Sequence, residues 1–162
     1  MKTFLALGAL VALFQSTSCL ERGVYQIKPG TRFHPLVLTD IGDIGDALEF
    51  TAATGAPTQA WSFTPTDGNT DEFMIQNHQG SYLYCRKEVG SSCLAGKDPQ
   101  TFIARRTLLG TYELVAKDSG YFIHSNSRWL EVAETADSFE GVFALVPINW
   151  HVTPMSLLKN NS

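Results

Sequence analysis

One spacing constrains the fold of this chain more than any other feature. Three aromatic residues, Trp61, Phe102 and Phe143, follow one another at two equal intervals of 41 residues. Each ends a short motif whose first position is Gln59, Gln100 or Gly141. Self-similarity at a fixed period of this length is typical of proteins built from repeated units. The spacing therefore predicts three copies of one structural unit.

A second aromatic series supports the same division. The pattern aromatic, any residue, aliphatic begins at Tyr25, Phe73 and Tyr112, at intervals of 48 and 39 residues. The longer first interval indicates extra loop residues in the first copy. We expect the rings of both series to meet in one shared core.

Short segments with period-two alternation lie between these anchors and are bounded by Gly, Pro, Asn and Asp. No amphipathic segment at helical spacing is long enough to predict a helix. The fold class is therefore all-β, with copies closed around a pseudo-threefold axis so that few sheet edges stay open. The predicted strands are 24–27, 36–39, 48–51 and 61–63, then 72–75, 82–85, 92–95 and 102–104, then 112–115, 121–124, 130–133 and 143–146.

Residues 45–63 resemble one repeat of a ricin-type β-trefoil and end in its Gln-x-Trp signature, Gln59 to Trp61. Residues 23–27 are similar to the opening strand of that family, and 118–121 to its turn before the second strand. The resemblance implies a β-trefoil domain over 22–148, with three four-stranded repeats. The resemblance implies carbohydrate binding, which is common in this family, and the chain also resembles small secreted fungal trefoil proteins, which include lectins and protease inhibitors.

The galactose-binding members of this family place an Asp on the second strand, an aromatic platform on the third strand and an Asn before the final Gln. In the first copy the resemblance puts Thr51 at the platform and Thr58 at the Asn, with Asp40 near the Asp position. Tyr84 and His124 take the Asp position in the second and third copies. The usual galactose pocket is therefore expected to be absent from all three copies.

Another route to sugar recognition needs an exposed aromatic ring and polar groups that bind hydroxyls. Trp129 is the leading candidate because it stands beside Asn126 and Arg128. The alternative for Trp129 is a packing role, partly buried beneath the 125–128 loop. The candidate carbohydrate-binding residues are Tyr84, His124, Trp129 and Asp40.

The N-terminus has the pattern of an export signal. Lys2 is followed by an apolar run over 4–14 and by small polar residues up to Ser18. We interpret 1–18 as a secretory signal peptide and expect a secreted, extracellular protein. The run is shorter than the roughly 20 apolar residues of a membrane span, so no span is predicted.

Export makes the cysteines interpretable, because disulfides persist in oxidising compartments. Cys19 lies at the expected cleavage point, which leaves Cys85 and Cys93 as a pair inside the domain. A disulfide across a hairpin is predicted, with two reduced buried thiols as the alternative. No His is spaced near the pair as a zinc site requires, so no metal and no cofactor are expected.

Charge and motifs exclude several classes of function. The chain has 12 Lys and Arg against 16 Asp and Glu, a net charge of −4, and no basic block for nucleic acid. The four His residues are scattered, and no nucleophile elbow or phosphate-binding glycine loop is present. We expect no catalytic residues and no enzymatic activity.

Protease inhibition is the main alternative to a lectin, because rigid loops bind tightly in active-site clefts. Arg32 and Phe33 lie between two prolines in the long first-copy loop, and Arg86 lies in the loop that the disulfide would close. Solvated side chains without a partner are the competing interpretation of each. A secreted effector that binds a host protein through the same loops is a further alternative.

The C-terminal tail, 149–162, follows the last repeat, and we expect Trp150 to pack against the barrel while the rest frays. The sequence as a whole predicts a secreted, monomeric, non-catalytic β-trefoil. Its predicted partners are glycans or glycoproteins, with an extracellular protease as the alternative.

Overall fold

The computed structural model describes residues 19–30, 35–68, 70–136 and 139–149. Within these ranges the regular structure is almost entirely β, with one short 3₁₀ turn at Pro57–Gln59. The strands are β1 Gly23–Pro29, β2 Leu36–Thr39, β3 Glu49–Ala52, β4 Trp61–Pro65, β5 Glu72–Asn77, β6 Tyr82–Cys85, β7 Cys93–Gly96, β8 Thr101–Arg106, β9 Tyr112–Ala116, β10 Phe122–Asn126, β11 Trp129–Ala133 and β12 Phe143–Pro147.

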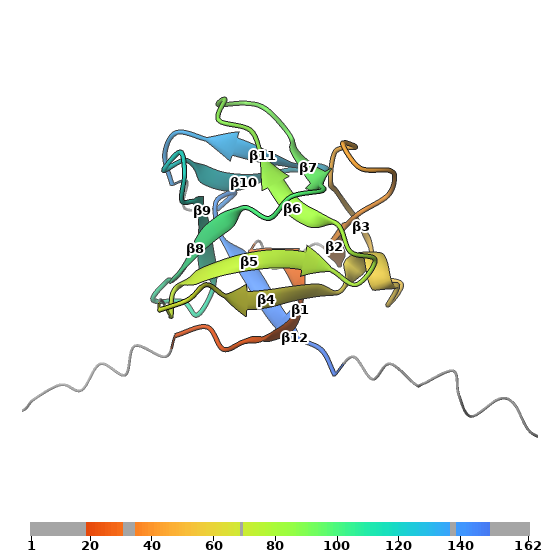
Figure 1. Cartoon of the computed structure of the whole chain (residues 1–162), viewed down its shortest axis with the longest axis horizontal. Coiled ribbons are helices and arrows are strands. Elements are labelled where there is room, and N and C mark those ends of the chain that lie inside the picture. The colour runs from red at the N-terminus through yellow and green to blue at the C-terminus, as the bar shows by residue number, and fades with distance from the viewer. Residues whose placement is uncertain (1–18, 31–34, 69, 137–138, 150–162) are drawn as a thin grey trace, which may run out of the picture.

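Six strands form a closed barrel (Figure 1). The antiparallel pairings run β1–β4, β4–β5, β5–β8, β8–β9, β9–β12 and β12–β1, so the last strand returns to the first. Closure leaves each barrel strand paired on both sides, which removes the exposed edges that would favour aggregation.

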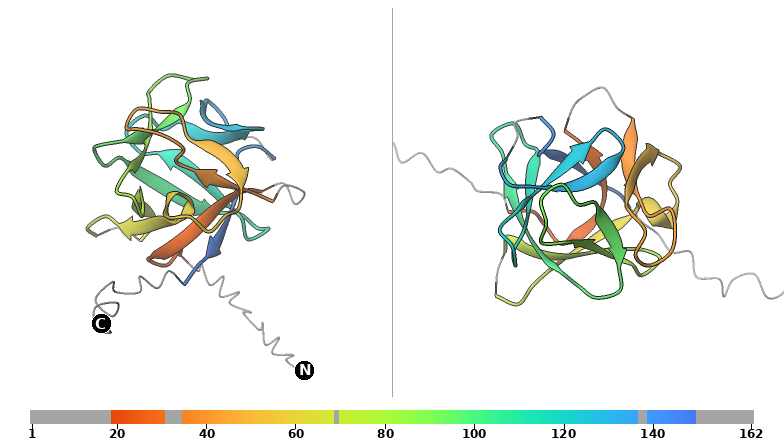
Figure 2. Two further views of the ribbon diagram at one scale, coloured as in Figure 1. Left: turned by 90° about the vertical axis from the view of Figure 1, so that its right-hand side faces the viewer. Right: turned by 90° about the horizontal axis from the view of Figure 1, so that it is seen from above.

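Three hairpins, β2–β3, β6–β7 and β10–β11, cover one end of this barrel. Figure 2 (right) looks down on that end. Backbone hydrogen bonds connect the hairpins around the axis: Leu48 N donates to Cys93 O at 2.9 Å, and Leu130 N donates to Leu48 O at 3.4 Å. Because Leu48, Cys93 and Leu130 follow one another around the axis, they are equivalent positions of the three copies.

The two aromatic series meet in register. In each copy the first-series residue pairs with the second-series residue across neighbouring barrel strands, as Tyr25–Trp61, Phe73–Phe102 and Tyr112–Phe143. Trp61, Phe102 and Phe143 are completely buried. Burying rings of this size stabilises a core by about 2–3 kcal/mol each.

The predicted β-trefoil is confirmed. All twelve predicted strands are present, with bounds that differ by three residues or fewer at each end. One expectation about the core is wrong: Tyr112 is only partly buried and packs at the margin of the core cluster. Tyr112 is the first residue of β9, directly after the 107–111 turn, and it pairs with Phe143.

Several predictions concern segments outside the described residues. They are the signal peptide at 1–18, the loop residues Arg32 and Phe33, and the tail from Trp150 onward. No helix of the described part of the chain is long and apolar enough to cross a membrane.

Candidate functional site

The second strand of each copy carries one equivalent position, one residue before its last inward-facing side chain. Tyr84 pairs with Leu94 on β7, and His124 pairs with Glu131 on β11. Each of these partners is the residue directly after Cys93 or Leu130. In the first copy the residue directly after Leu48 is Glu49, and it pairs with Thr39, so Thr39 is the equivalent position. The sequence placed this position among residues 36–38, and the structure shifts it to Thr39 because the strands are aligned by their pairing.

Asp40 therefore falls one residue beyond that position, at the equivalent of Cys85 and Ser125. Side chains alternate along a strand, so this position faces the interior. Asp40 is 3% exposed, and its Oδ2 accepts a hydrogen bond from Asn77 Nδ2 at 2.7 Å. The structure thus places Asp40 in the interior as a buried hydrogen-bonding group, and its carboxylate is not available at a surface site.

Tyr84 is the most exposed of the three equivalent residues. It is 40% exposed, whereas Thr39 is buried and His124 is intermediate. Thr39 is covered because Gln59 Nε2 donates to its hydroxyl at 3.1 Å. The second copy alone among these three positions therefore offers an open aromatic side chain.

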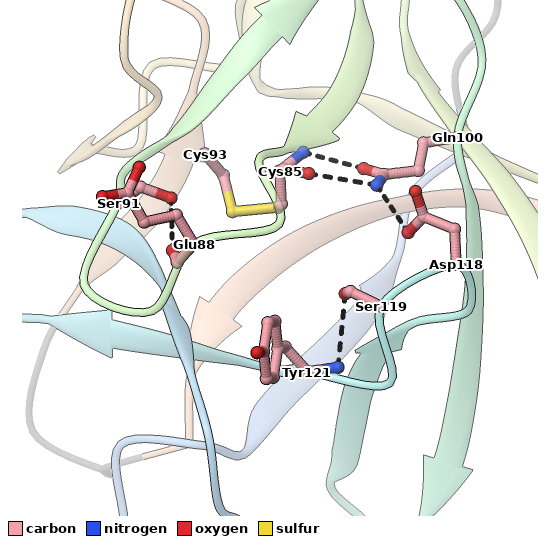
Figure 3. Close-up of a disulfide and its surroundings, with 8 residues drawn as sticks. All are labelled: Cys85, Glu88, Ser91, Cys93, Gln100, Asp118, Ser119 and Tyr121. Atoms are coloured by element: carbon pink, nitrogen blue, oxygen red, sulfur yellow. Dashed lines mark hydrogen bonds between the residues drawn. A yellow bond between two sulfur atoms is a disulfide. The ribbon is translucent and has the colours of Figure 1, made fainter.

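The strand that carries Tyr84 is fixed by a disulfide and by a buried glutamine (Figure 3). The predicted disulfide is confirmed: Cys85 and Cys93 are bonded and are register partners in the β6–β7 hairpin. Gln100 Oε1 accepts from Cys85 N at 2.7 Å, and Gln100 Nε2 donates to Cys85 O at 3.0 Å. Gln100 therefore binds both the backbone N and the backbone O of Cys85, the residue that follows Tyr84.

Tyr84 lines two surface hollows. The first, the Lys117 hollow, has a volume of about 410 Å³. Its charged groups are paired: Lys117 Nζ contacts Glu72 Oε2 at 2.6 Å, and Asp118 accepts from Gln100 at 3.0 Å and contacts Lys87 at 3.2 Å. The hollow is lined by Tyr84, Pro99, Gln100, Thr101, Lys117 and Asp118.

The second hollow, the Lys97 hollow, has a volume of about 290 Å³. Two of its lining residues, Ile44 and Gly45, come from the first copy and the rest from the second, so the hollow crosses a boundary between repeats. It is lined by Ile44, Gly45, Tyr84, Arg86, Leu94, Ala95, Gly96, Lys97 and Asp98. The Lys117 hollow alone lies in the lower part of the size range of small-molecule sites, about 300–1,000 Å³, and the Lys97 hollow lies at its lower limit.

The sequence named Tyr84 and Arg86 of these residues and missed Lys97, Asp98, Lys117 and Asp118. The signal for the Lys117 hollow was present, since Gln100 aligns with Gln59 at the 41-residue period. The Lys97 hollow has no local sequence pattern, because two of its lining residues, Ile44 and Gly45, come from a loop distant in the sequence.

Trp129 lies on the third copy and is half-buried. The Arg128 guanidinium carbon lies 4.8 Å from the centre of the Trp129 ring and covers one face of it. Two hydrogen bonds, of 2.8 and 2.9 Å, join Arg128 to the buried Glu49 carboxylate. These bonds and the charge of Glu49 raise the pKa of Arg128. One indole face is thus occupied, which agrees with the packing interpretation of Trp129.

Other chemistry has little geometric support. Ser62 Oγ lies 3.1 Å from His78 Nε2, but neither residue lines either of the two hollows beside Tyr84. Within the described residues, no group of three or more His, Cys, Asp or Glu side chains is placed to hold a metal ion.

No family model and no curated protein matches this sequence. Solved structures do match. A Polyporus squamosus lectin bound to a glycan epitope has a TM-score of 0.68 and 14% identity, over 79% of this chain and 50% of that one. The Rhizoctonia solani agglutinin has a TM-score of 0.67 and 12% identity, over 80% and 97%. The designed threefold-symmetric protein ThreeFoil has a TM-score of 0.64 and 17% identity, over 78% and 99%.

The chain has a β-trefoil fold, as these lectins do. At 12–17% identity these likenesses show the fold alone. This trefoil spans half the length of the Polyporus lectin and nearly all of the Rhizoctonia agglutinin. Because one fold hosts several functions, the function of this trefoil has to be argued from its own side chains.

Proposed function

We propose that this trefoil is a non-catalytic lectin that binds carbohydrate at Tyr84. The observation that carries the proposal is the exposed Tyr84 side chain, which lines two hollows that also contain charged side chains. A tyrosine ring packs against the apolar face of a pyranose, and its hydroxyl can donate or accept. The lectin neighbours support this assignment at the level of the fold.

The polar groups beside Tyr84 suit sugar hydroxyls. Asp118 and Lys117 line one hollow and Asp98 and Lys97 line the other, so each hollow offers a carboxylate acceptor and an ammonium donor. The Cys85–Cys93 disulfide and the Gln100 bonds hold β6 in place before a ligand arrives. Such preorganisation raises affinity because less conformational entropy is lost on binding.

A glycan array followed by titration calorimetry tests the proposal. We expect retention on at least one glycan, and Tyr84→Ala should weaken that binding by at least about tenfold, a loss of about 1.4 kcal/mol. Phe139→Ala is the matched control, because Phe139 is an exposed aromatic residue outside both hollows. Circular dichroism checks that each variant is folded.

Two results would refute this assignment: no retention on any glycan, or full binding by Tyr84→Ala. His124→Ala and Trp129→Ala form a second arm. Loss of binding in those variants, with Tyr84→Ala unaffected, would move the site to the third copy.

Protease inhibition through Arg86 is the second candidate. Arg86 is exposed and is the first residue of the 86–92 loop, whose two ends are joined by the disulfide. Ser91 stiffens this loop, since its N and Oγ both donate to Glu88 O, at 3.1 and 2.6 Å. Inhibition of trypsin that is lost in Arg86→Ala would favour this function, and the first-copy residues Arg32 and Phe33 would be tested in the same assay.

We propose an extracellular location for either function. The disulfide supports an oxidising compartment. The apolar run over 4–14 supports export. Detection of the mature protein in culture medium, starting after residue 18 or 19, tests this location.

A further inference from the structure

The Lys97 hollow differs from the Lys117 hollow in whether its charged side chains have partners within the protein. Arg86, Lys97 and Asp98 all line it, and none of these three side chains has a hydrogen bond or ion pair with another described residue. In the Lys117 hollow, by contrast, Lys117 and Asp118 are both paired within the protein. Among the residues that the structure describes, the Lys97 hollow therefore holds two cations and one carboxylate without a partner.

This excess of positive charge runs against the charge of the whole chain, which is −4. The Arg86 and Lys97 side chains are exposed to solvent, so their attraction for an anion is long-ranged and is screened by salt. The negative charge of Asp98 repels a small free anion and so weakens its binding. The same carboxylate accepts hydrogen bonds from sugar hydroxyls, so the set favours a ligand with both an anionic group and hydroxyls.

One wall of the hollow is apolar and is supplied by the first copy. Ile44 is 57% exposed and lies in the loop between β2 and β3. This loop is held over β7 because Gly45 N donates to Ala95 O at 2.7 Å and Ala95 N donates to Asp46 O at 2.8 Å. Gly45 has a φ of 99°, a conformation that only glycine adopts without strain. Ile44 and Tyr84 thus face the same small volume from different repeats.

The geometry points to an acidic glycan as the ligand of this lectin, with its ring against Tyr84 and its carboxylate or sulfate bound by Arg86 and Lys97 in the Lys97 hollow. This inference rests on the carbohydrate-binding function proposed above. It adds the class of sugar, which is a glycan that contains a uronic acid, a sialic acid or a sulfate. It also adds the two residues that select this glycan, Arg86 and Lys97. Asp98 binds hydroxyls of the same sugar.

Matched pairs of glycans test the inference. We expect the purified protein to bind a sialylated, uronic or sulfated glycan at least about tenfold more tightly than its neutral counterpart at low salt. Raising the NaCl concentration should reduce this preference, because the anionic group stays partly exposed to solvent. The sialylated, uronic and sulfated arms distinguish a carboxylate from a sulfate as the anionic group.

Two charge-neutralising variants locate the selectivity. Lys97→Gln and Arg86→Gln should each weaken binding of the acidic glycan more than binding of its neutral counterpart, so that the ratio of the two affinities falls. Arg22→Gln is the matched control, since it removes one exposed positive charge outside the hollow. Tyr84→Ala should weaken both glycans, which separates ring contact from charge recognition.

The outcomes of these experiments test the acidic preference separately from carbohydrate binding at Tyr84. Equal affinity for acidic and neutral glycans, lost in Tyr84→Ala, would overturn the acidic preference and keep the lectin. A preference that survives both glutamine variants would overturn the assignment to this hollow. Absence of binding to every glycan would overturn both proposals.

Discussion

Gly96 on β7 lies directly against Tyr84 on β6. A Cβ atom built on Gly96 would lie 2.6 Å from Tyr84 Cβ and 3.3 Å from the Tyr82 carbonyl oxygen. The backbone of Gly96 therefore sets where the Tyr84 side chain leaves its strand. A methyl group at residue 96 would displace the Tyr84 side chain from the position that it occupies beside the two hollows.

Gly96→Ala should accordingly destabilise the fold by about 1–3 kcal/mol, the usual range for overpacking. It should also weaken glycan binding, although residue 96 supplies no polar side chain. Urea denaturation measures the first effect and calorimetry the second. In a Tyr84→Gly background the clash is absent, so the same substitution should cost much less; an equal cost in both backgrounds would contradict the steric explanation.

Removal of the Cys85–Cys93 disulfide should lower the free energy of unfolding by about 2 kcal/mol. The effect is moderate because the bond closes a loop of eight residues in sequence separation and thus constrains a short segment of the unfolded chain. The Cys85→Ala, Cys93→Ala double variant tests this by urea denaturation. Cys19→Ala should leave stability unchanged, since Cys19 is exposed and outside the bridge. A double variant as stable as the native protein would rule out this contribution.

Gln59→Met should destabilise the protein by about 3 kcal/mol. The Gln59 carboxamide is buried, its oxygen accepts from Thr54 N at 2.7 Å and Gly55 N at 3.2 Å, and its nitrogen donates to Ala52 O at 2.9 Å. Methionine has a similar volume but leaves these groups without partners, which is costly in the interior. Thermal unfolding measures the loss. Gln76→Met, which removes one exposed bond to Gly80 O, is the control and should change stability by less than about 0.5 kcal/mol.

Stability should fall as the pH rises above 10, because of Tyr25. Burial raises the pKa of Tyr25 above its usual 10.0, with smaller contributions from Tyr112 and Glu21. A raised pKa in the folded state means that the stabilisation is complete below pH 10 and is lost as the pH passes the folded value. The Tyr25 hydroxyl also donates to Glu21 O at 2.8 Å, a bond that the phenolate cannot make.

Tyr25→Phe isolates this term. The variant should lose about 1 kcal/mol at neutral pH, the net worth of one hydrogen bond, and its stability should fall less steeply between pH 10 and 11. Urea midpoints measured across this range provide the comparison. Identical alkaline slopes for the two proteins would show that another group controls the decline.

The interface between the first and third copies explains why Trp129 was hard to interpret from the sequence. Arg128 could hold a sugar or lie free, and nothing in the local pattern distinguishes these cases. In the structure Arg128 binds Glu49, which is 79 residues away, and the guanidinium group then covers the neighbouring indole ring. A long-range ion pair therefore decided the environment of Trp129.

The sequence by itself determined the repeat, the strands and the core. The 41-residue period, the alternation of apolar residues and the two aromatic series are local or periodic signals, and they follow from the geometry of strands that bury one face. The tertiary structure decided which of the equivalent residues reach the surface. Asp40 faces inward and Tyr84 outward because strand register fixes the facing of each side chain, and the Lys97 hollow exists only because closing the barrel brings the loop of Ile44 beside Arg86 and Lys97.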